Sequence, residues 1–287
     1  MSVLFTDSNS ELWYTQIKKL GMEYISMPYT LDDKEYYYDC GETYDDKAFF
    51  DAIRGGSMPI TSALNPQNYI DIFEPILKAN EDILYIHFSS KLSGTFNFMN
   101  QAIEELKVKY PQRTIKTVDT LSITTGAGLI AYEAGVMHKR GATDDEIIKF
   151  VEKFRQESAC YFVVDDLNHL KRGGRLSATS AFVGSMLGIK PMLKVDEEGK
   201  IVNCDKIVGR KKSILALVDK LRETGENVND YDIYVMHADC IADAEFLKNK
   251  VLESYPEARV TIQPIGPTIG THCGPNTLGL VFHCKHR

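Results

Sequence analysis

The sequence predicts an α/β protein with a helix-covered parallel sheet in its first half and a mixed α/β domain in its second. Short apolar runs alternate with segments of helical periodicity almost from the first residue, a pattern typical of β-α-β units. With 287 residues, 44% hydrophobic and 25% charged, the chain can bury two cores. No Pro-, Gly- or Ser-rich linker divides it. We therefore expect two closely packed domains, residues 1–159 and 160–287.

Turn and capping residues set the boundaries of the elements in the first half. Gly55-Gly56 ends one helix, Asn65-Pro66 begins the next, and Thr143 with Glu146 forms a capping box. The expected strands are residues 3–6, 24–29, 35–38, 83–88 and 114–118. The expected helices are residues 10–20, 45–54, 66–79, 96–110, 126–139 and 143–157.

The second half begins with a strand at residues 161–164 and contains a hairpin. Its two strands, residues 192–195 and 200–207, flank a turn at residues 196–199. Before the hairpin, Ser177 caps an apolar helix that runs to about Leu187. After it, helices at residues 210–223 and 243–255 alternate with strands at residues 232–237, 259–263 and 278–284. We expect a mixed sheet in this half.

Charge and hydropathy exclude several classes of protein. The net charge of −7 argues against nucleic-acid binding, which needs a basic surface. The first residues lack the basic segment of a signal peptide. A notable uncharged run, residues 176–189, is too short to span a bilayer. We expect a cytoplasmic protein without stable membrane insertion.

The six cysteines form no Cys-x-x-Cys pair, which fits a reducing compartment. A zinc site near the C-terminus is the alternative, because His272 and Cys273 could join His283, Cys284 and His286. However, adjacent residues on the strand expected at 278–284 face opposite sides, which disfavours joint ligation. We expect no metal and no cofactor.

The most informative segment is a loop of small hydroxyl residues after the strand at residues 83–88. Ser89, Ser90, Ser93 and Thr95 stand within seven residues, and Gly94 allows a ligand to approach the backbone. The free N–H groups of the helix that follows would favour an oxyanion, at the strand ends where α/β proteins bind ligands. The alternative is that these residues only cap the helix and form turns.

Three further segments carry candidate functional residues. Thr61-Ser62 is a second hydroxyl pair just before a helix start, and Lys171-Arg172-Gly173-Gly174-Arg175-Leu176-Ser177 is a basic turn. The third, residues 265–275, is a Gly/Pro-rich turn with one histidine, His272.

At these segments the sequence resembles the DegV family of bacterial fatty-acid-binding proteins. The matching motifs, in the order and spacing of the family, are Thr6-Asp7-Ser8, Thr61-Ser62, Ser93-Gly94-Thr95, Arg172-Gly173-Gly174-Arg175-Leu176-Ser177 and Ile269-Gly270-Thr271-His272-x-Gly274-Pro275. The resemblance implies two α/β domains of the DegV type with one long-chain fatty acid between them. It also implies a non-catalytic role, in which the carboxyl group is presented to the ATP-binding subunit of a fatty acid kinase. An acyltransferase of phospholipid metabolism is a further implied partner.

The resemblance also implies roles for individual residues. The fatty-acid carboxylate would be bound by Thr61, Ser62, Ser93, Gly94, Thr95 and His272. The acyl-chain pocket would include Ala178, Ala181, Phe182 and Met186, for which ordinary core packing is the alternative. Arg172 and Arg175 would dock a partner, the alternative being a solvated turn.

Physical chemistry supports this head-group set. A buried carboxylate needs several hydrogen bonds to offset its desolvation, and hydroxyl and N–H groups can supply them. An arginine clamp would cover the oxygens that a kinase must reach. The tail can provide affinity at about 0.8 kcal/mol per buried CH₂.

Two other functions are weaker interpretations. A serine-dependent acyl hydrolase using Ser93 would need an activating base, such as His87 or His272. The chain contains no Gly-x-Ser-x-Gly motif, and nothing in the sequence orients such a triad. A nucleotide-using enzyme is disfavoured because neither a P-loop nor a Gly-x-Gly-x-x-Gly motif occurs.

Overall fold

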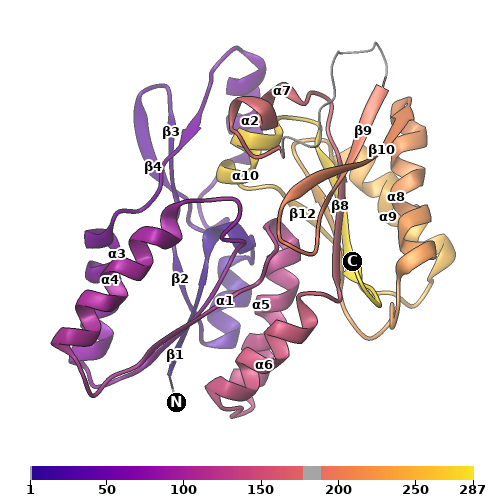
Figure 1. The fold of residues 1–287 in the computed structure, drawn as a ribbon. Helices are drawn as coiled ribbons and strands as arrows, with labels where there is room; N and C mark the ends of the chain where they lie inside the picture. The colour runs from indigo at the N-terminus through magenta and orange to yellow at the C-terminus, as the bar shows by residue number, and fades with distance from the viewer. Residues whose placement is uncertain (1, 177–188) are drawn as a thin grey trace. The chain divides into compact units, whose positions relative to one another are not determined.

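The computed structural model describes residues 2–176 and 189–287, and the chain forms two compact units (Figure 1). Unit 1 comprises Met1–Tyr44 and Thr61–Arg155; unit 2 comprises Asp45–Ile60 and Gln156–Arg287. The second break lies close to the division expected after residue 159. The first half, however, contributes residues 45–60 to unit 2, which the sequence did not predict.

Unit 1 is built on a parallel sheet of four strands in the order β2-β1-β6-β7. All three neighbouring pairs are parallel, as the β-α alternation predicts. The strands are β1 (Val3–Asp7), β2 (Glu23–Ile25), β6 (Ile83–His87) and β7 (Ile115–Asp119). Every residue of β6 is buried, as expected of a central strand covered on both faces. All four strands run in the same direction, so their carboxyl ends share one edge.

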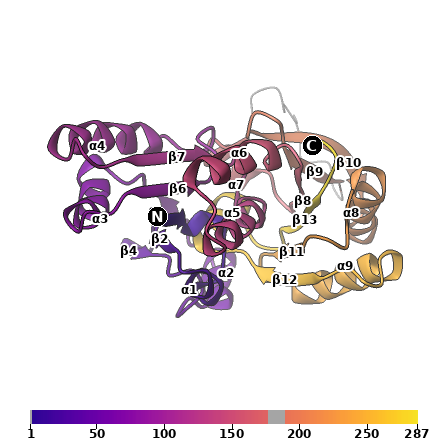
Figure 2. The ribbon, with the colours of Figure 1, turned by 90° about the horizontal axis from the view of Figure 1, so that it is seen from below.

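Helices cover both faces of this sheet (Figures 1 and 2). On one face lie α3 (Pro66–Lys78) and α4 (Thr95–Lys109). On the other lie α1 (Tyr14–Leu20), α5 (Thr124–Lys139) and α6 (Asp144–Phe154). The predicted helix starts at Asn65 and Thr143 are confirmed, since each side chain accepts the N–H group three residues on.

Two predicted elements near the N-terminus are wrong. The helix expected from residue 10 begins only at Tyr14, because the preceding segment forms a short 3₁₀ helix, η1 (Ser8–Ser10), and Glu11 then adopts a left-handed conformation with φ 53°. The strand expected at residues 24–29 is split between two sheets. Its second part joins a small sheet of β3 (Pro28–Leu31), β4 (Lys34–Tyr37) and β5 (Ile60–Thr61).

Unit 2 contains a mixed sheet of six strands in the order β10-β9-β8-β13-β11-β12. Only β11 and β12 pair in parallel; the other pairs are antiparallel, and β9 with β10 forms the predicted hairpin. The strands are β8 (Ser158–Val163), β9 (Ile189–Val195), β10 (Ile201–Val208), β11 (Ile233–His237), β12 (Val260–Pro264) and β13 (Leu278–His283).

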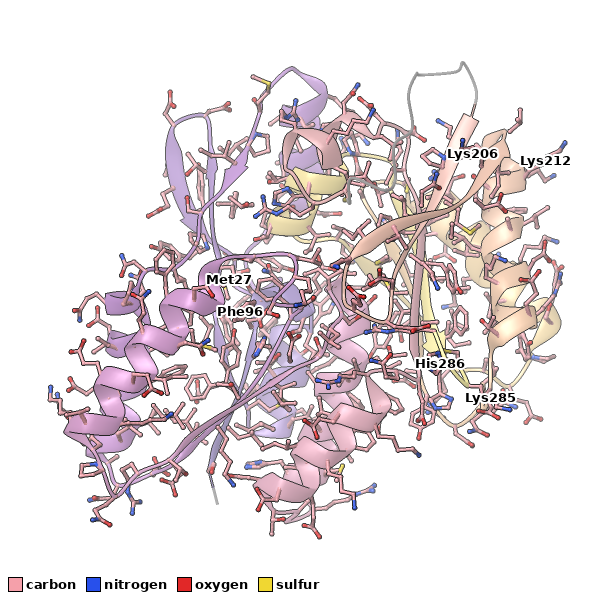
Figure 3. The ribbon with its side chains drawn as sticks, in the orientation of Figure 1. Met27, Phe96, Lys206, Lys212, Lys285 and His286 are labelled. Atoms are coloured by element: carbon pink, nitrogen blue, oxygen red, sulfur yellow. The ribbon has the colours of Figure 1, made fainter. Side chains whose placement is uncertain are left out.

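One face of this sheet is covered by α8 (Arg210–Thr224) and α9 (Ile241–Ser254). The core between them includes Leu217, Leu247 and Phe282, none of which is exposed. Lys206 on β10 and Lys212 on α8 project into solvent (Figure 3). The helices carry apolar residues on one side and charged residues on the other, as burial against a sheet requires.

The described part of unit 2 also contains three short helices: α2 (Asp46–Arg54), α7 (Asn168–Arg172) and α10 (Pro267–Cys273). The segment containing α10 was expected to be a turn, but Pro267 at its start favours a helix. A Cβ at Gly270 would lie 2.8–2.9 Å from the rings of Phe49 and Phe50. This close approach is why α2 belongs to unit 2.

The helix expected from Ser177 to Leu187 lies outside the described residues. The same holds for the predicted acyl-chain residues Ala178, Ala181, Phe182 and Met186.

The packing of α5 gives a stability prediction. Gly128→Ala is expected to lower the free energy of unfolding by about 1–3 kcal/mol, because its Cβ would lie 2.4 Å from the Ser10 carbonyl oxygen. Gly135→Ala on the same helix is the matched control, since its Cβ would meet the movable side chains of Met22 and Leu20. Both changes gain about 1 kcal/mol of helix propensity. Urea denaturation measures the difference, and equal stabilities would contradict this packing.

Candidate functional site

The loop that connects β6 to α4 is held by its backbone from three directions. Three consecutive N–H groups donate to acceptors on different segments: Phe88 to the Asp7 carboxylate (3.0 Å), Ser89 to the Ser122 carbonyl (2.7 Å) and Ser90 to the Asp119 carboxylate (3.1 Å). These acceptors follow β1 and β7 or close them, so the neighbours of β6 on both sides hold the loop. The loop is therefore fixed at the carboxyl edge of the sheet.

Further along, the loop satisfies some of its own N–H groups and leaves two open. Ser89 accepts the N–H groups of Lys91 and Leu92, and the Ser93 hydroxyl accepts that of Thr95 (3.2 Å). Within residues 2–176 and 189–287, the N–H groups of Ser93 and Gly94 have no protein acceptor. Both lie at the N-terminus of α4, a helix of 15 residues, where N–H groups and the helix dipole favour an anion. The predicted anion site thus has two available donors.

Thr95 connects this loop to the second hydroxyl pair. Its side chain is 1% exposed; its hydroxyl donates to the Leu64 carbonyl (3.4 Å) and lies 2.9 Å from the Tyr69 hydroxyl. Leu64 is two residues after Ser62, so the Thr61-Ser62 and Ser93-Gly94 segments both lie within three residues of this contact. Thr61 is half-buried and Ser62 is exposed. The Thr95 hydroxyl is thus engaged within the protein.

Asp7 belongs to the motif Thr6-Asp7-Ser8, but the sequence predicted no role for it at this edge. It is 0% exposed, and its carboxylate accepts N–H groups from Asn9 and Phe88 and the hydroxyl of Tyr85, each at 3.0 Å. Burial raises its pKa to about 7, against the lowering effect of these donors. The available signal was an acidic residue directly at the end of a buried apolar strand.

His272 belongs to unit 2, where it lies on α10 against the turn after α7. A Cβ at Gly173 would lie 2.2 Å from His272 Nδ1, so only glycine permits this packing. Burial, and secondly the positive charge of Arg175, lower the pKa of His272 to about 4. At neutral pH the imidazole is uncharged and can form hydrogen bonds without contributing a positive charge.

The two arginines of the basic turn lie in different environments. Arg172 is exposed; its guanidinium lies 3.0 Å from His169 Nδ1 and contacts the sulfur of Met58 at 3.6 Å. Arg175 is half-buried, donates to the Gly173 carbonyl, and has a pKa lowered by burial. Arg172 therefore offers an accessible charge, whereas Arg175 acts on His272.

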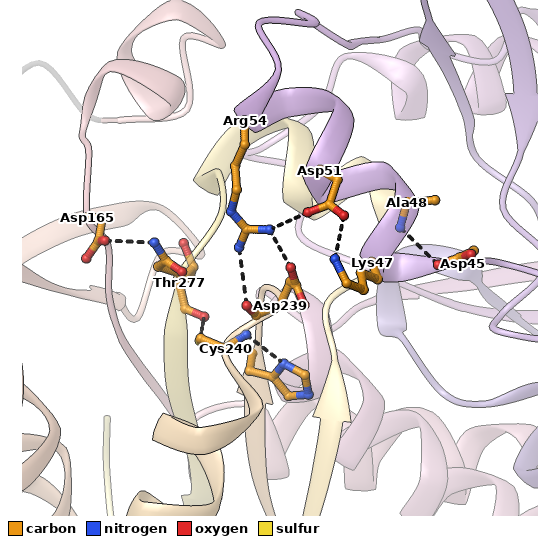
Figure 4. A network of polar contacts seen from close by, with 11 residues as sticks. Asp45, Lys47, Ala48, Asp51, Arg54, Asp165, Asp239, Cys240 and Thr277 are labelled. Atoms are coloured by element: carbon orange, nitrogen blue, oxygen red, sulfur yellow. Dashed lines mark hydrogen bonds and ion pairs between the residues drawn. The ribbon is translucent and has the colours of Figure 1, made fainter.

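A polar network holds α2 within unit 2 (Figure 4). The Arg54 guanidinium pairs with Asp51 on the same helix (3.1 Å) and with Asp239 after β11. It also donates to the Asp239 carbonyl at 3.2 Å. These groups are partly exposed, so each pair contributes little alone. Their role is geometric, because they orient α2 over Gly270 and hence α10.

The described residues offer no arrangement for metal or triad chemistry. Among them, no group of three or more His, Cys, Asp or Glu side chains could hold a metal ion. No histidine or carboxylate in the same residues hydrogen-bonds to the Ser93 hydroxyl. The His87 ring packs on Phe96 at 4.2 Å, and its Nδ1 lies 2.7 Å from the Phe88 carbonyl. No helix in this part of the chain is long and apolar enough to cross a membrane.

The fold and this loop define a two-unit α/β protein with two available N–H donors at the carboxyl edge of its parallel sheet. The chain belongs to the DegV family: the model described as "Uncharacterised protein, DegV family" matches residues 2–285. It is 42% identical to a DegV domain-containing protein of Clostridium perfringens over 280 residues, covering 98% of this chain and 96% of that relative.

Solved structures of the same family share the fold. A Thermus thermophilus structure, described as fatty acid binding of a DegV family protein, is 26% identical with a TM-score of 0.86; 98% of this chain and 99% of that one are covered. A Bacillus subtilis structure, described as DegV, a fatty acid binding protein, is 28% identical with a TM-score of 0.83, and 99% of each chain is covered. These relatives match the chain from end to end.

The environment of His272 gives a pH prediction. The imidazole should titrate near pH 4 by NMR, and Arg175→Ala should raise this pKa by removing a positive charge, yet leave it below 6.5 because burial is the larger cause. Since the folded-state pKa is lowered, the unfolded chain binds the proton first. Stability is then lost as pH falls from about 6.5 to about 4. Lys171→Ala, on the same turn, should leave the titration unchanged; an ordinary His272 pKa would contradict the assigned burial.

Proposed function

We propose that this protein binds one long-chain fatty acid and presents its carboxyl group to the ATP-binding subunit of a fatty acid kinase. The observation that carries the proposal is the pair of available N–H groups at Ser93 and Gly94, beside the Ser93 hydroxyl, at the start of α4. Relatives described as fatty-acid-binding share the family and the fold. These donors can hydrogen-bond to the two acceptor oxygens of a carboxylate, which supports the proposal.

The head-group site uses neutral donors. Thr61, Ser62, Ser93 and Gly94 are proposed to supply hydroxyl and N–H groups, and His272 is a further proposed donor. His272 is uncharged at neutral pH because its pKa is lowered to about 4. Hydrogen bonds to a charged group contribute about 1.5–3 kcal/mol each, enough to orient a carboxylate. Thr95 is included in the proposed set because it links the two hydroxyl segments.

The tail provides most of the affinity. At about 0.8 kcal/mol per buried CH₂, a long acyl chain contributes on the order of 10 kcal/mol before the costs of ordering it. The residues proposed for the acyl-chain pocket are Ala178, Ala181, Phe182 and Met186. A division of labour follows, in which the tail retains the ligand and the head group positions the carboxylate.

The protein itself is proposed to be non-catalytic and cytoplasmic. Ser93 has no hydrogen-bonded base in the described part of the chain, so no observation favours the hydrolase alternative. Arg172 is exposed and is the proposed contact for the kinase, while an acyltransferase would use the acyl phosphate that the kinase forms. Arg175, beside His272, is the second arginine proposed for this docking surface.

Removing the Ser93 hydroxyl should weaken fatty-acid binding. Ser93→Ala is expected to raise the dissociation constant for palmitate about tenfold, since it removes a hydrogen bond to a charged oxygen worth roughly 1.5 kcal/mol. Titration of delipidated protein with palmitate, followed by native mass spectrometry, measures this. Thr261→Ala removes an exposed hydroxyl on β12 and serves as the control. Equal affinity for Ser93→Ala, or no saturable uptake by the unaltered protein, would refute the proposal.

Replacing Arg172 should affect transfer to the kinase. Arg172→Ala is expected to slow acyl-phosphate formation severalfold and to weaken its salt dependence, because exposed interface charges act mainly on association. Palmitate affinity should stay unchanged. Lys171→Ala, which removes a neighbouring exposed charge, is the control. Lost palmitate binding with normal phosphorylation would place Arg172 in the lipid site instead.

A further inference from the structure

The contacts of Asp7 extend beyond its own strand to the loop between β6 and α4. Its carboxylate closes β1, yet two of its three donors, the Tyr85 hydroxyl and the Phe88 N–H, belong to β6 and the residue that follows it. Phe88 is the first residue of the loop that leads to Ser93 and Gly94. Both of these donors converge on a single oxygen, Oδ2, and the Asn9 N–H reaches the other.

This geometry needs a carboxylate. Backbone N–H groups cannot turn away, and an asparagine would direct its NH₂ group at one or two of them. An apolar side chain would leave these donors without an acceptor, which would be costly in a buried site. The arrangement therefore selects an ionised, fully buried acid at the base of the loop.

We propose that Asp7 is the positioning residue of the head-group site: its carboxylate holds Phe88 and so sets the positions of the Ser93 and Gly94 N–H groups. The ligand in this inference rests on the proposed function, whereas the role of Asp7 in positioning the loop does not. Asp7 does not touch the ligand. Asp119 holds Ser90 in the same way (3.1 Å), so two carboxylates fix the start of the loop.

The surroundings of Asp7 make its charge responsive to pH. The titratable groups facing it are Tyr85 on β6, Tyr69 on α3 and Cys40, and the pKa of each is raised by burial or by the charge of Asp7 itself. Glu11, the residue directly after η1, adds negative charge near Cys40. No cation is among the causes that act on Asp7. Its charge is therefore stabilised by hydrogen-bond donors, which are Tyr85 and the N–H groups of Phe88, Asn9 and Ser10.

Protonation of Asp7 would loosen the loop. A hydrogen bond to a neutral carboxyl is roughly half as strong as one to a carboxylate, so the hold on Phe88 weakens as pH falls through about 7. Ser93 and Gly94 would then be less well ordered for an anion. The head-group site should consequently be best formed at slightly alkaline pH.

The first test needs no fatty acid. In ligand-free protein labelled with ¹⁵N-glycine and ¹⁵N-phenylalanine, the amide signals of Phe88 and Gly94 should titrate together with a midpoint near pH 7. Tyr85→Phe should move this midpoint upward, because it removes a donor that lowers the pKa of Asp7. The pKa of His87 is lowered by burial, so its titration lies at lower pH. A Gly94 signal that stays constant while Phe88 titrates would overturn the proposal.

The second test measures binding at pH 8.5, where both Asp7 and palmitate are ionised. Asp7→Asn should raise the palmitate dissociation constant about tenfold, the expected effect of misplacing one charged hydrogen bond, and should abolish the Gly94 titration. Unchanged affinity in the folded variant would overturn the proposal. If Asp7→Asn does not fold, Tyr85→Phe decides alone. If the unaltered protein binds no palmitate, the proposed function fails, while the amide titration still decides the role of Asp7.

Discussion

The buried carboxylate of Asp7 and its three donors form the interaction on which the carboxyl edge of unit 1 depends. Burial raises its pKa from 3.8 to about 7, so ionising Asp7 costs about 4 kcal/mol more in the folded protein than in the unfolded chain. Because the folded state binds the proton more tightly than the unfolded chain, the protonated Asp7 adds to the free energy of unfolding. This added stability is lost as pH rises from about 4 to about 7. The ionised state of Asp7 is thus less stable than the protonated state, but its carboxylate joins β1, β6 and the loop before α4.

Other strained features lie at the same edge. Glu11 and Thr124 both adopt left-handed backbone conformations, with φ 53° at each, and the Thr124 hydroxyl donates to the Glu11 carboxylate. Such conformations cost about 1–2 kcal/mol in residues other than glycine. Gly128 lets α5 approach the Ser10 carbonyl closely, which presses the two strained segments together. Strain of this kind persists where surrounding contacts fix it, and it is typical of functional sites.

The sequence predicted the elements better than their connections. Caps at Asn65 and Thr143, the parallel sheet and the hairpin followed from local chemistry, because each depends on residues close in the chain. The transfer of residues 45–60 to unit 2 could not be predicted in this way. It depends on Phe49 and Phe50 packing over Gly270, a contact between residues more than 200 positions apart. The late start of α1 likewise reflects tertiary burial of Asp7 and Glu11, which overrides local helix propensity.

The same limit applies to the candidate site. The hydroxyl loop was visible as a run of Ser, Thr and Gly. Nothing in that run, however, separated Ser93, which has an available N–H group, from Thr95, whose hydroxyl is occupied. Nor did it separate exposed Arg172 from half-buried Arg175. These distinctions are set by which partners the fold brings near each side chain. Asp7 shows this most clearly, since its donors at Tyr85 and Phe88 lie about 80 residues away in the chain.

The proposed head-group site has no permanent cation, which would suit a ligand that is held and then transferred, as we propose. A guanidinium in bidentate contact would bind the carboxylate strongly and occupy both of its oxygens. Arg175 is instead directed to the Gly173 carbonyl, and its charge helps to keep His272 neutral. In the proposed site, neutral donors would orient the carboxylate through geometry, so the accuracy of that geometry would matter more than the number of charges. The proposed site would therefore depend mainly on the groups that fix the loop, above all on the carboxylate of Asp7.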